Sequence, residues 1–139
     1  MDKVLIDTDI FSEILKGINR QIAARASAYH ANFGYYTICT ITVLEIVKGW
    51  HKHQREDKIQ QFFVEITEAQ VLTLQLGDAE LAGRIYADLE RTGQPIGLAD
   101  AIIAAIAIEQ NLTLVSGNIS HYERIQALDY NLKLDNWRI

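Results

Sequence analysis

Three acidic residues lie within apolar stretches of the sequence or directly after one. Asp7 directly follows a short apolar run, Glu45 is the only charged residue in the segment 41–47, and Asp100 is the only one in the segment 98–108. A carboxylate removed from water is costly unless a cation or several hydrogen bonds compensate it. The three acids are therefore the first candidates for a site that binds a cation.

Two neutral oxygen donors extend this candidate site. Ser116 and Asn118 follow the apolar segment that ends at residue 115. Magnesium prefers six oxygen ligands, keeps several waters and needs only a few carboxylates around an open cavity. We therefore predict that Asp7, Glu45 and Asp100 bind the metal and that Asn118 completes the catalytic group.

Helix capping is the alternative explanation for two of these acids. Asp7 precedes a predicted helix and could cap it, although Asp9 suits that role at least as well. Asp100 lies near the start of another predicted helix and could cap that one. On the residues alone, Asp9 remains either a cap or a neighbour of the site.

Alternating strands and helices indicate the fold class. A parallel sheet between layers of helices is expected when buried strands alternate with helical segments, and such sheets bind ligands beyond the carboxyl ends of their strands. This predicts an α/β fold with a mostly parallel sheet, in which Asp7 and Ser116 reach the same edge. The predicted strands are 4–6, 35–41, 71–74, 112–115 and an edge strand at 132–134; the predicted helices are 10–28 with a break at Gly17, 42–50, 58–68, 78–91 capped by Asp78, 99–109 and one from Ser120.

Composition limits the class of protein. The 139 residues fit a single domain, 1–139, with 49% hydrophobic and 22% charged residues. No apolar run approaches the length of a membrane helix, and the single cysteine, Cys39, cannot form an internal disulfide. We expect a soluble, cytoplasmic protein with Cys39 in its core.

Charge is unevenly distributed along the chain. The net charge of −5 argues against a nucleic-acid partner, because phosphate binding usually accompanies a basic surplus. One basic cluster nevertheless stands out, and it is either a solvated helix face or a contact for RNA or protein. Its members are Lys48, His51, Lys52, His53, Arg55 and Lys58.

Four segments in this order resemble the PIN-domain family, in particular the VapC-like toxins of prokaryotic toxin–antitoxin pairs. They are residues 4–9, 41–49, 95–105 and 114–122. The resemblance implies a three-layer α/β/α sandwich, dependence on magnesium or manganese, and cleavage of an RNA substrate. It also implies a cognate antitoxin protein as partner, and a homodimeric toxin.

The same resemblance assigns roles to the candidate residues. Asp7, Glu45 and Asp100 match the acids of the family, and Asn118 stands at a fourth acidic position where many relatives have Asp. The implied reaction is hydrolysis of an RNA phosphodiester by a metal-activated water. The loss of one acid bears on whether one metal ion or two are held.

Two other functions are alternatives to a ribonuclease. The stretch Asp7-Thr8-Asp9 resembles the nucleophile motif of haloacid-dehalogenase-type phosphatases, but Phe11 stands where that motif has Thr or Val, and a later acidic pair is missing. The second alternative is a catalytically silent PIN-like protein-binding module. A metal titration and an RNA-cleavage assay with an EDTA control distinguish the three.

Overall fold

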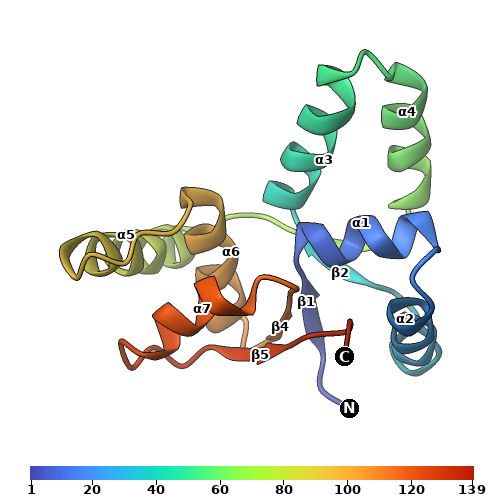
Figure 1. Cartoon of the computed structure of the whole chain (residues 1–139). Helices are drawn as coiled ribbons and strands as arrows, with labels where there is room; N and C mark the ends of the chain where they lie inside the picture. The colour runs from blue at the N-terminus through green and yellow to red at the C-terminus, as the bar shows by residue number, and fades with distance from the viewer.

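The computed structural model describes all residues, 1–139, as five short strands and seven helices that alternate along most of the chain (Figure 1). The elements are β1 (Val4–Ile6), α1 (Thr8–Lys16), α2 (Arg20–Phe33), β2 (Thr37–Cys39), α3 (Thr40–Lys52), α4 (Glu56–Glu65), β3 (Gln70–Leu72), α5 (Leu76–Arg91), α6 (Leu98–Glu109), β4 (Thr113–Val115), α7 (Ile119–Gln126) and β5 (Lys133–Asp135).

Every strand pair is parallel, as predicted. Hydrogen-bonded ladders join β1 to β4 and β4 to β5 in one sheet, and a further ladder joins β2 to β3 in a second sheet. β2 contacts β1, so the two sheets lie side by side. The predicted edge strand is confirmed at Lys133–Asp135, where β5 pairs with β4 alone.

The core lies on both faces of the sheet, because successive residues of a strand point to opposite sides. Val4 and Ile6 of β1 pack into one apolar cluster with residues of α1, α2, α3 and α4. Leu5, between them, packs into a second cluster with residues of α5, α6 and α7. Figure 1 shows these two groups of helices on opposite sides of the strands, which gives the three-layer arrangement. The side chain of Cys39 is fully buried, as expected.

Two helices end at glycines in the left-handed region of the backbone, which glycine adopts without steric cost. Gly17 has φ 68° and ends α1, which confirms the predicted break. α2 then begins after Asn19, whose side chain accepts a hydrogen bond from the Ile22 amide at 3.0 Å. It continues to Phe33, beyond the predicted end at residue 28, because Gly34 with φ 82° is the next residue suited to stop it.

Several other boundaries differ from the sequence prediction, and two of these differences have a clear local cause. The second strand is Thr37–Cys39, shorter than the predicted 35–41, because α3 already begins at Thr40. Asp78 is not the N-cap of α5: the helix starts three residues earlier, after Gln75. The Asp78 carboxylate instead accepts a hydrogen bond from the Gln75 amide at 2.9 Å, which satisfies one of the free donors at the helix start.

α3 and α4 form an antiparallel pair that projects beyond the carboxyl ends of the strands (Figure 1). No helix of the protein combines the length and apolar character needed to cross a membrane.

Candidate active site

The carboxyl ends of β1 and β4 bring Asp7 and Ser116 together. The Asp7 amide continues the ladder by donating to the Val115 carbonyl at 2.8 Å. The Ser116 hydroxyl in turn donates to Asp7 Oδ2 at 2.8 Å. Both side chains are buried, so the sheet itself fixes the position of this carboxylate.

Asp7 is also the N-cap of α1, because its Oδ1 accepts a hydrogen bond from the Thr8 amide at 2.8 Å. Of the two roles left open for Asp9, capping is therefore excluded, because Asp9 lies inside the first turn of the helix. Its Oδ2 accepts a hydrogen bond from the Gly117 amide at 2.9 Å instead. Asp9 thus ties the start of α1 to the loop that follows β4, beside the cavity described below.

Burial raises the pKa of the Asp7 carboxyl from 3.8 to about 6. The hydrogen bonds from Ser116 and the Thr8 amide oppose this rise, whereas the negative charges of Asp9 and Asp100 add to it. The ionised form of Asp7 is therefore less favourable in the folded protein without a cation than in water. A cation beside it would reverse that cost, as an opposite charge favours the ionised form.

Tyr122 of α7 lies between two of the acids. Its side chain is fully buried, and its hydroxyl is 3.0 Å from Asp7 Oδ2 and 3.3 Å from Asp100 Oδ1. Burial and the charges of the two carboxylates raise the pKa of Tyr122 well above its ordinary value. The phenol therefore keeps its proton and donates a hydrogen bond to the acids.

Glu45 is held by a hydroxyl from a neighbouring helix. Thr8 Oγ1 donates to Glu45 Oε1 at 2.6 Å and lies 3.0 Å from the hydroxyl of Thr42. Glu45 is half-buried, less enclosed than its apolar sequence context suggests. One oxygen of Glu45 is thus occupied by Thr8, and the side chain as a whole lines the cavity.

Asp100 is the third residue of α6 and not its cap, because the N-cap position belongs to Gly97. The capping alternative is therefore wrong, although the helix N-terminus still favours a negative charge there. Asp100 Oδ2 lies 3.6 Å from His121 Nδ1, and its side chain is 23% exposed. This carboxylate is accessible to a ligand from the solvent side.

Asn118 and His121 are neighbours beside Asp100. Asn118 Nδ2 is 2.8 Å from His121 Nδ1, and the Asn118 amide donates to the Ser116 hydroxyl at 2.9 Å. Through these contacts Asn118 is joined to Ser116 and to His121, whose ring lies next to Asp100.

One polar cavity of about 470 Å³ brings the predicted site residues together, and none of its lining residues is hydrophobic. Its walls include all four residues selected from the sequence, together with four that come from the loops and helix starts around them. The eight are Asp7, Thr8, Asp9, Glu45, Asp100, Gly117, Asn118 and Arg138.

Sequence reasoning missed three contributors to this site. Thr8 holds Glu45, Tyr122 contacts two acids, and Arg138 adds a positive charge to the lining. Thr8 could have been noticed because it follows Asp7 directly at a strand end. Nothing in the sequence marks Tyr122 or Arg138, because each reaches the acids only through the fold.

No group of three His, Cys, Asp or Glu side chains is close enough together in this structure to hold a metal ion directly. The Tyr122 hydroxyl lies between Asp7 and Asp100, and the Thr8 hydroxyl occupies one oxygen of Glu45. The carboxylates therefore share a cavity without forming a closed metal cage.

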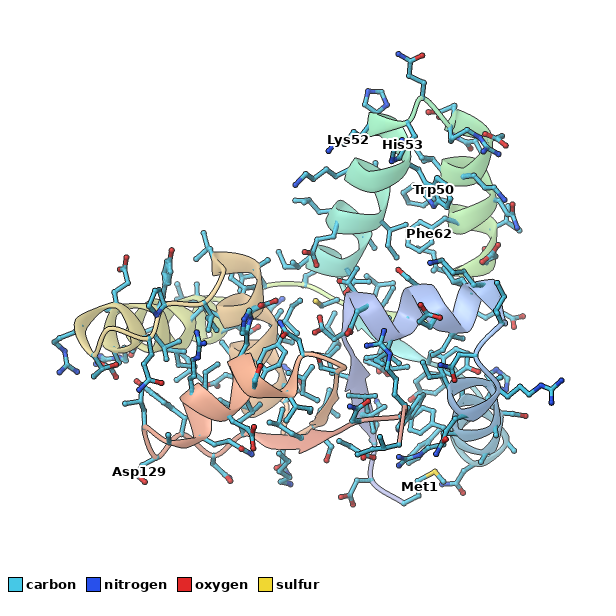
Figure 2. All side chains as sticks on the ribbon, viewed as in Figure 1. Met1, Trp50, Lys52, His53, Phe62 and Asp129 are labelled. Carbon is cyan, nitrogen blue, oxygen red and sulfur yellow. The ribbon has the colours of Figure 1, made fainter.

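A second groove adjoins the acidic cavity and shares Thr8 and Glu45 with it. It has a volume of about 590 Å³ and lies between α1, α3 and α4. Figure 2 shows Trp50 and Phe62, both of which line the groove, pointing toward each other between α3 and α4.

The basic cluster lies at the α3–α4 end of the molecule. Lys52 and His53 are near the tip of the pair (Figure 2), and both are exposed. Arg55 is paired with Asp57 at 2.9 Å. Lys58 lies over the Trp50 ring at 5.8 Å. The exposure of these side chains fits both alternatives for the basic cluster, a solvated helix face and a contact surface for RNA or protein.

Comparison with known proteins gives a consistent result along almost the whole chain. The family model of the PIN domain matches residues 4–127. Ribonuclease VapC2 of Haemophilus influenzae is 32% identical over 141 residues, which cover 99% of each chain. The tRNA(fMet)-specific endonuclease VapC of Shigella flexneri is 29% identical, over 92% of this chain and 96% of its own. The crystal structure of DNA-bound VapBC from Salmonella typhimurium contains a chain of similar fold, with a TM-score of 0.82, 28% identity and 99% of both chains covered.

Proposed function

The chain belongs to the PIN-domain family, and from this premise we propose that it is a metal-dependent endoribonuclease, the toxin of a toxin–antitoxin pair. Its reaction is the hydrolysis of RNA phosphodiester bonds at the acidic cavity. The observation that carries the proposal is that Asp7, Glu45 and Asp100, which come from three separate parts of the chain, line one polar cavity together with Asn118. The curated relatives named as ribonucleases support the same activity.

The donor set suits magnesium, with manganese as an alternative. All the candidate ligands are hard oxygen donors, and Asp7 is a buried carboxylate whose pKa is raised to about 6 in the protein alone. Magnesium is commonly bound through one or two carboxylates and keeps several waters, so it does not need a preformed cage of three acids. Asp7, Asp100 and Glu45 would hold the ion, in part through water.

A bound ion would lower the pKa of a water molecule and offset the negative charge of the phosphodiester. The other residues of the cavity orient the carboxylates. Ser116 and Tyr122 donate hydrogen bonds to Asp7, and Thr8 donates to Glu45. Hydroxyls held in this way fix the direction of each carboxylate before the substrate arrives, which lowers the cost of reorganisation during the reaction.

Asn118 reduces the negative charge of the site. An Asp at this position would add another carboxylate to the lining of the cavity, whereas the amide adds no charge. Fewer carboxylates lower both the mutual repulsion in the empty site and the attraction for a second cation. We therefore propose that one ion is bound firmly.

The proposed partners follow from the same assignment. They are an RNA substrate, a cognate antitoxin protein and a second copy of the chain in a homodimer. We place the activity in the cytoplasm, where RNA and a co-expressed antitoxin are both present. Co-purification with the product of an adjacent reading frame tests the antitoxin.

The test of the activity is a cleavage assay on total transfer RNA and ribosomal RNA, with magnesium or manganese and with EDTA as control. Wild-type protein and an Asp100→Asn variant are compared with Asp129→Asn as a matched control. Asp129 is exposed, lies far from the cavity after α7 (Figure 2), and has φ 67°, a conformation that Asn tolerates well. We expect cleavage only with the metal, retained in Asp129→Asn and lost in Asp100→Asn.

Other outcomes would reject the proposal. Cleavage that persists in EDTA would show that no metal is needed. A folded wild-type protein that cuts neither RNA but retains a protein partner would favour the silent binding module. The phosphatase alternative is set aside by the family match over residues 4–127.

A further inference from the structure

Arg138 is the only positively charged residue among the eight that line the acidic cavity. It is next to last in the chain, in the segment that follows β5. Four acids of the lining, Asp7, Asp9, Glu45 and Asp100, would repel a polyanion. A single cation at their edge therefore has a large effect on how an anionic substrate approaches.

The C-terminal segment holds the backbone of Arg138 in place. Trp137 is buried, with its ring 5.6 Å from that of Tyr29. Arg25 of α2 donates to the carbonyls of Asn136 and Ile139 at 3.1 and 3.0 Å, on either side of Arg138. The chain end is thus anchored to the body of the protein and does not project freely into solvent.

The guanidinium of Arg138, in contrast, has no hydrogen-bonded partner. Its nearest anion is Asp9 Oδ2 at 3.7 Å, beyond the range of about 2.7–2.9 Å for a charge-assisted hydrogen bond. The same Asp9 oxygen already accepts the Gly117 amide at 2.9 Å. The Arg138 side chain is 39% exposed, so its donors remain available to a ligand.

Gly117 makes this placement possible. A Cβ atom at position 117 would lie 2.1 Å from Arg138 Nη1 and 2.6 Å from Asp9 Oδ2, which is closer than real Cβ contacts. The absence of a side chain therefore lets the guanidinium lie against the loop that carries Asn118. That loop follows β4 and borders the acids.

We propose that Arg138 is a substrate-binding residue that takes a backbone phosphate of the RNA at the mouth of the acidic cavity. The inference rests on the proposed ribonuclease function. A guanidinium presents a planar fork of donors that matches two phosphate oxygens. Its anchored backbone, free donors and position beside the acids are the features that such a contact needs. Weak pairing with Asp9 keeps the side chain oriented until RNA replaces it.

The experiment measures RNA binding without turnover and then turnover itself. For binding, Asp100→Asn protein in magnesium is the parent, and a fluorescently labelled single-stranded RNA of mixed sequence is the probe. Arg138→Ala is added to this parent and compared with Arg84→Ala. Arg84 is 68% exposed and paired with Glu80 on α5, so its removal changes net charge equally but away from the cavity.

We expect Arg138→Ala to weaken binding roughly tenfold, the scale of one charge-assisted hydrogen bond. The slope of log K against log salt should also fall by about 0.7, the value for one phosphate contact on a single strand. Arg84→Ala should change neither quantity appreciably. In the otherwise wild-type enzyme, Arg138→Ala should raise KM more than it lowers kcat. Melting temperatures verify folding, and Arg138→Gln replaces Arg138→Ala if the alanine variant does not fold.

The experiment distinguishes a failure of the proposed phosphate contact from a failure of the proposed ribonuclease function. If wild-type protein cleaves RNA but the Arg138 variant binds and turns over like Arg84→Ala, the phosphate contact is wrong and the ribonuclease function stands. If the wild-type protein cleaves no RNA, the function is wrong and the contact falls with it. A lower melting temperature with unchanged RNA affinity would assign Arg138 a structural role only.

Discussion

Asp7 makes the stability of the metal-free protein depend on pH in a direction opposite to that of most acids. Burial raises the pKa of its carboxyl from 3.8 to about 6. At about 1.4 kcal/mol per pKa unit, this rise corresponds to roughly 3 kcal/mol of unfolding free energy. A raised pKa means that the folded state binds the proton more tightly. The contribution is therefore fully present below about pH 4 and lost as the pH rises to and past about 6.

An Asp7→Asn variant isolates this contribution from those of other groups that titrate in the same range. The amide can still accept from the Thr8 amide, and the hydroxyls of Ser116 and Tyr122 can accept from its NH₂ group. Relative to wild type, the variant should gain most of roughly 3 kcal/mol as the pH is raised from about 4 to about 8 in EDTA. If the substitution also changes the free energy of unfolding by repacking, that change is the same at every pH and does not affect the pH dependence of the difference between variant and wild type.

The assay is urea denaturation at a series of pH values, with and without magnesium. A wild-type-minus-variant difference that does not change with pH would refute the reasoning, because it would mean that Asp7 titrates alike in the folded and unfolded states. Magnesium should remove the disadvantage of the wild type above pH 6, since a ligand that binds only the folded state stabilises it by RT ln(1 + [L]/Kd). Asp7→Asn should respond much less to the ion.

Three further variants test other parts of the site. Asp100→Asn should abolish RNA cleavage in magnesium while leaving the melting temperature in EDTA unchanged or higher, because it removes a charge that raises the pKa of a neighbouring acid; undiminished cleavage would contradict this. Gly117→Ala should lower the free energy of unfolding, measured by urea denaturation, by about 1 kcal/mol and weaken RNA binding, because its Cβ would displace the Arg138 side chain; RNA affinity equal to wild type would count against the placement. Charge reversal at Lys48 and Lys52 should flatten the salt dependence of RNA binding if the basic cluster contacts RNA, and an unchanged slope would identify it as a solvated face.

Much of the fold could be predicted from local sequence patterns. The run Val4–Ile6 is apolar throughout, as expected for a strand buried on both faces, and a strand of these three residues is found there. Gly17 marked the end of the first helix because few other residues adopt positive φ there without strain. Boundaries were less certain where two elements abut, as at Thr40, because a β-branched sequence can end a strand or begin a helix.

The identity of the acids was also readable from the sequence. Glu45 and Asp100 stand out because a charge in an apolar segment needs compensation, and Asp7 stands out because it closes an apolar strand, where a parallel sheet binds ligands. These arguments use only neighbouring residues. All three were selected in this way and line one cavity. Their metal-binding and catalytic roles are still predictions.

Only the tertiary structure decided how the site is completed. The Tyr122 hydroxyl meets Asp7 across 115 positions of sequence, and Gly117 meets Asp9 across 108. Arg138 reaches the cavity because the chain end is anchored to α2. A local sequence pattern can show only that a residue differs in polarity from the segment of chain around it. Tyr122, Gly117 and Arg138 do not differ from their segments in this way. Their roles arise from the packing of the helices and the C-terminal segment around the parallel sheet, which sets distances that spacing along the chain does not encode.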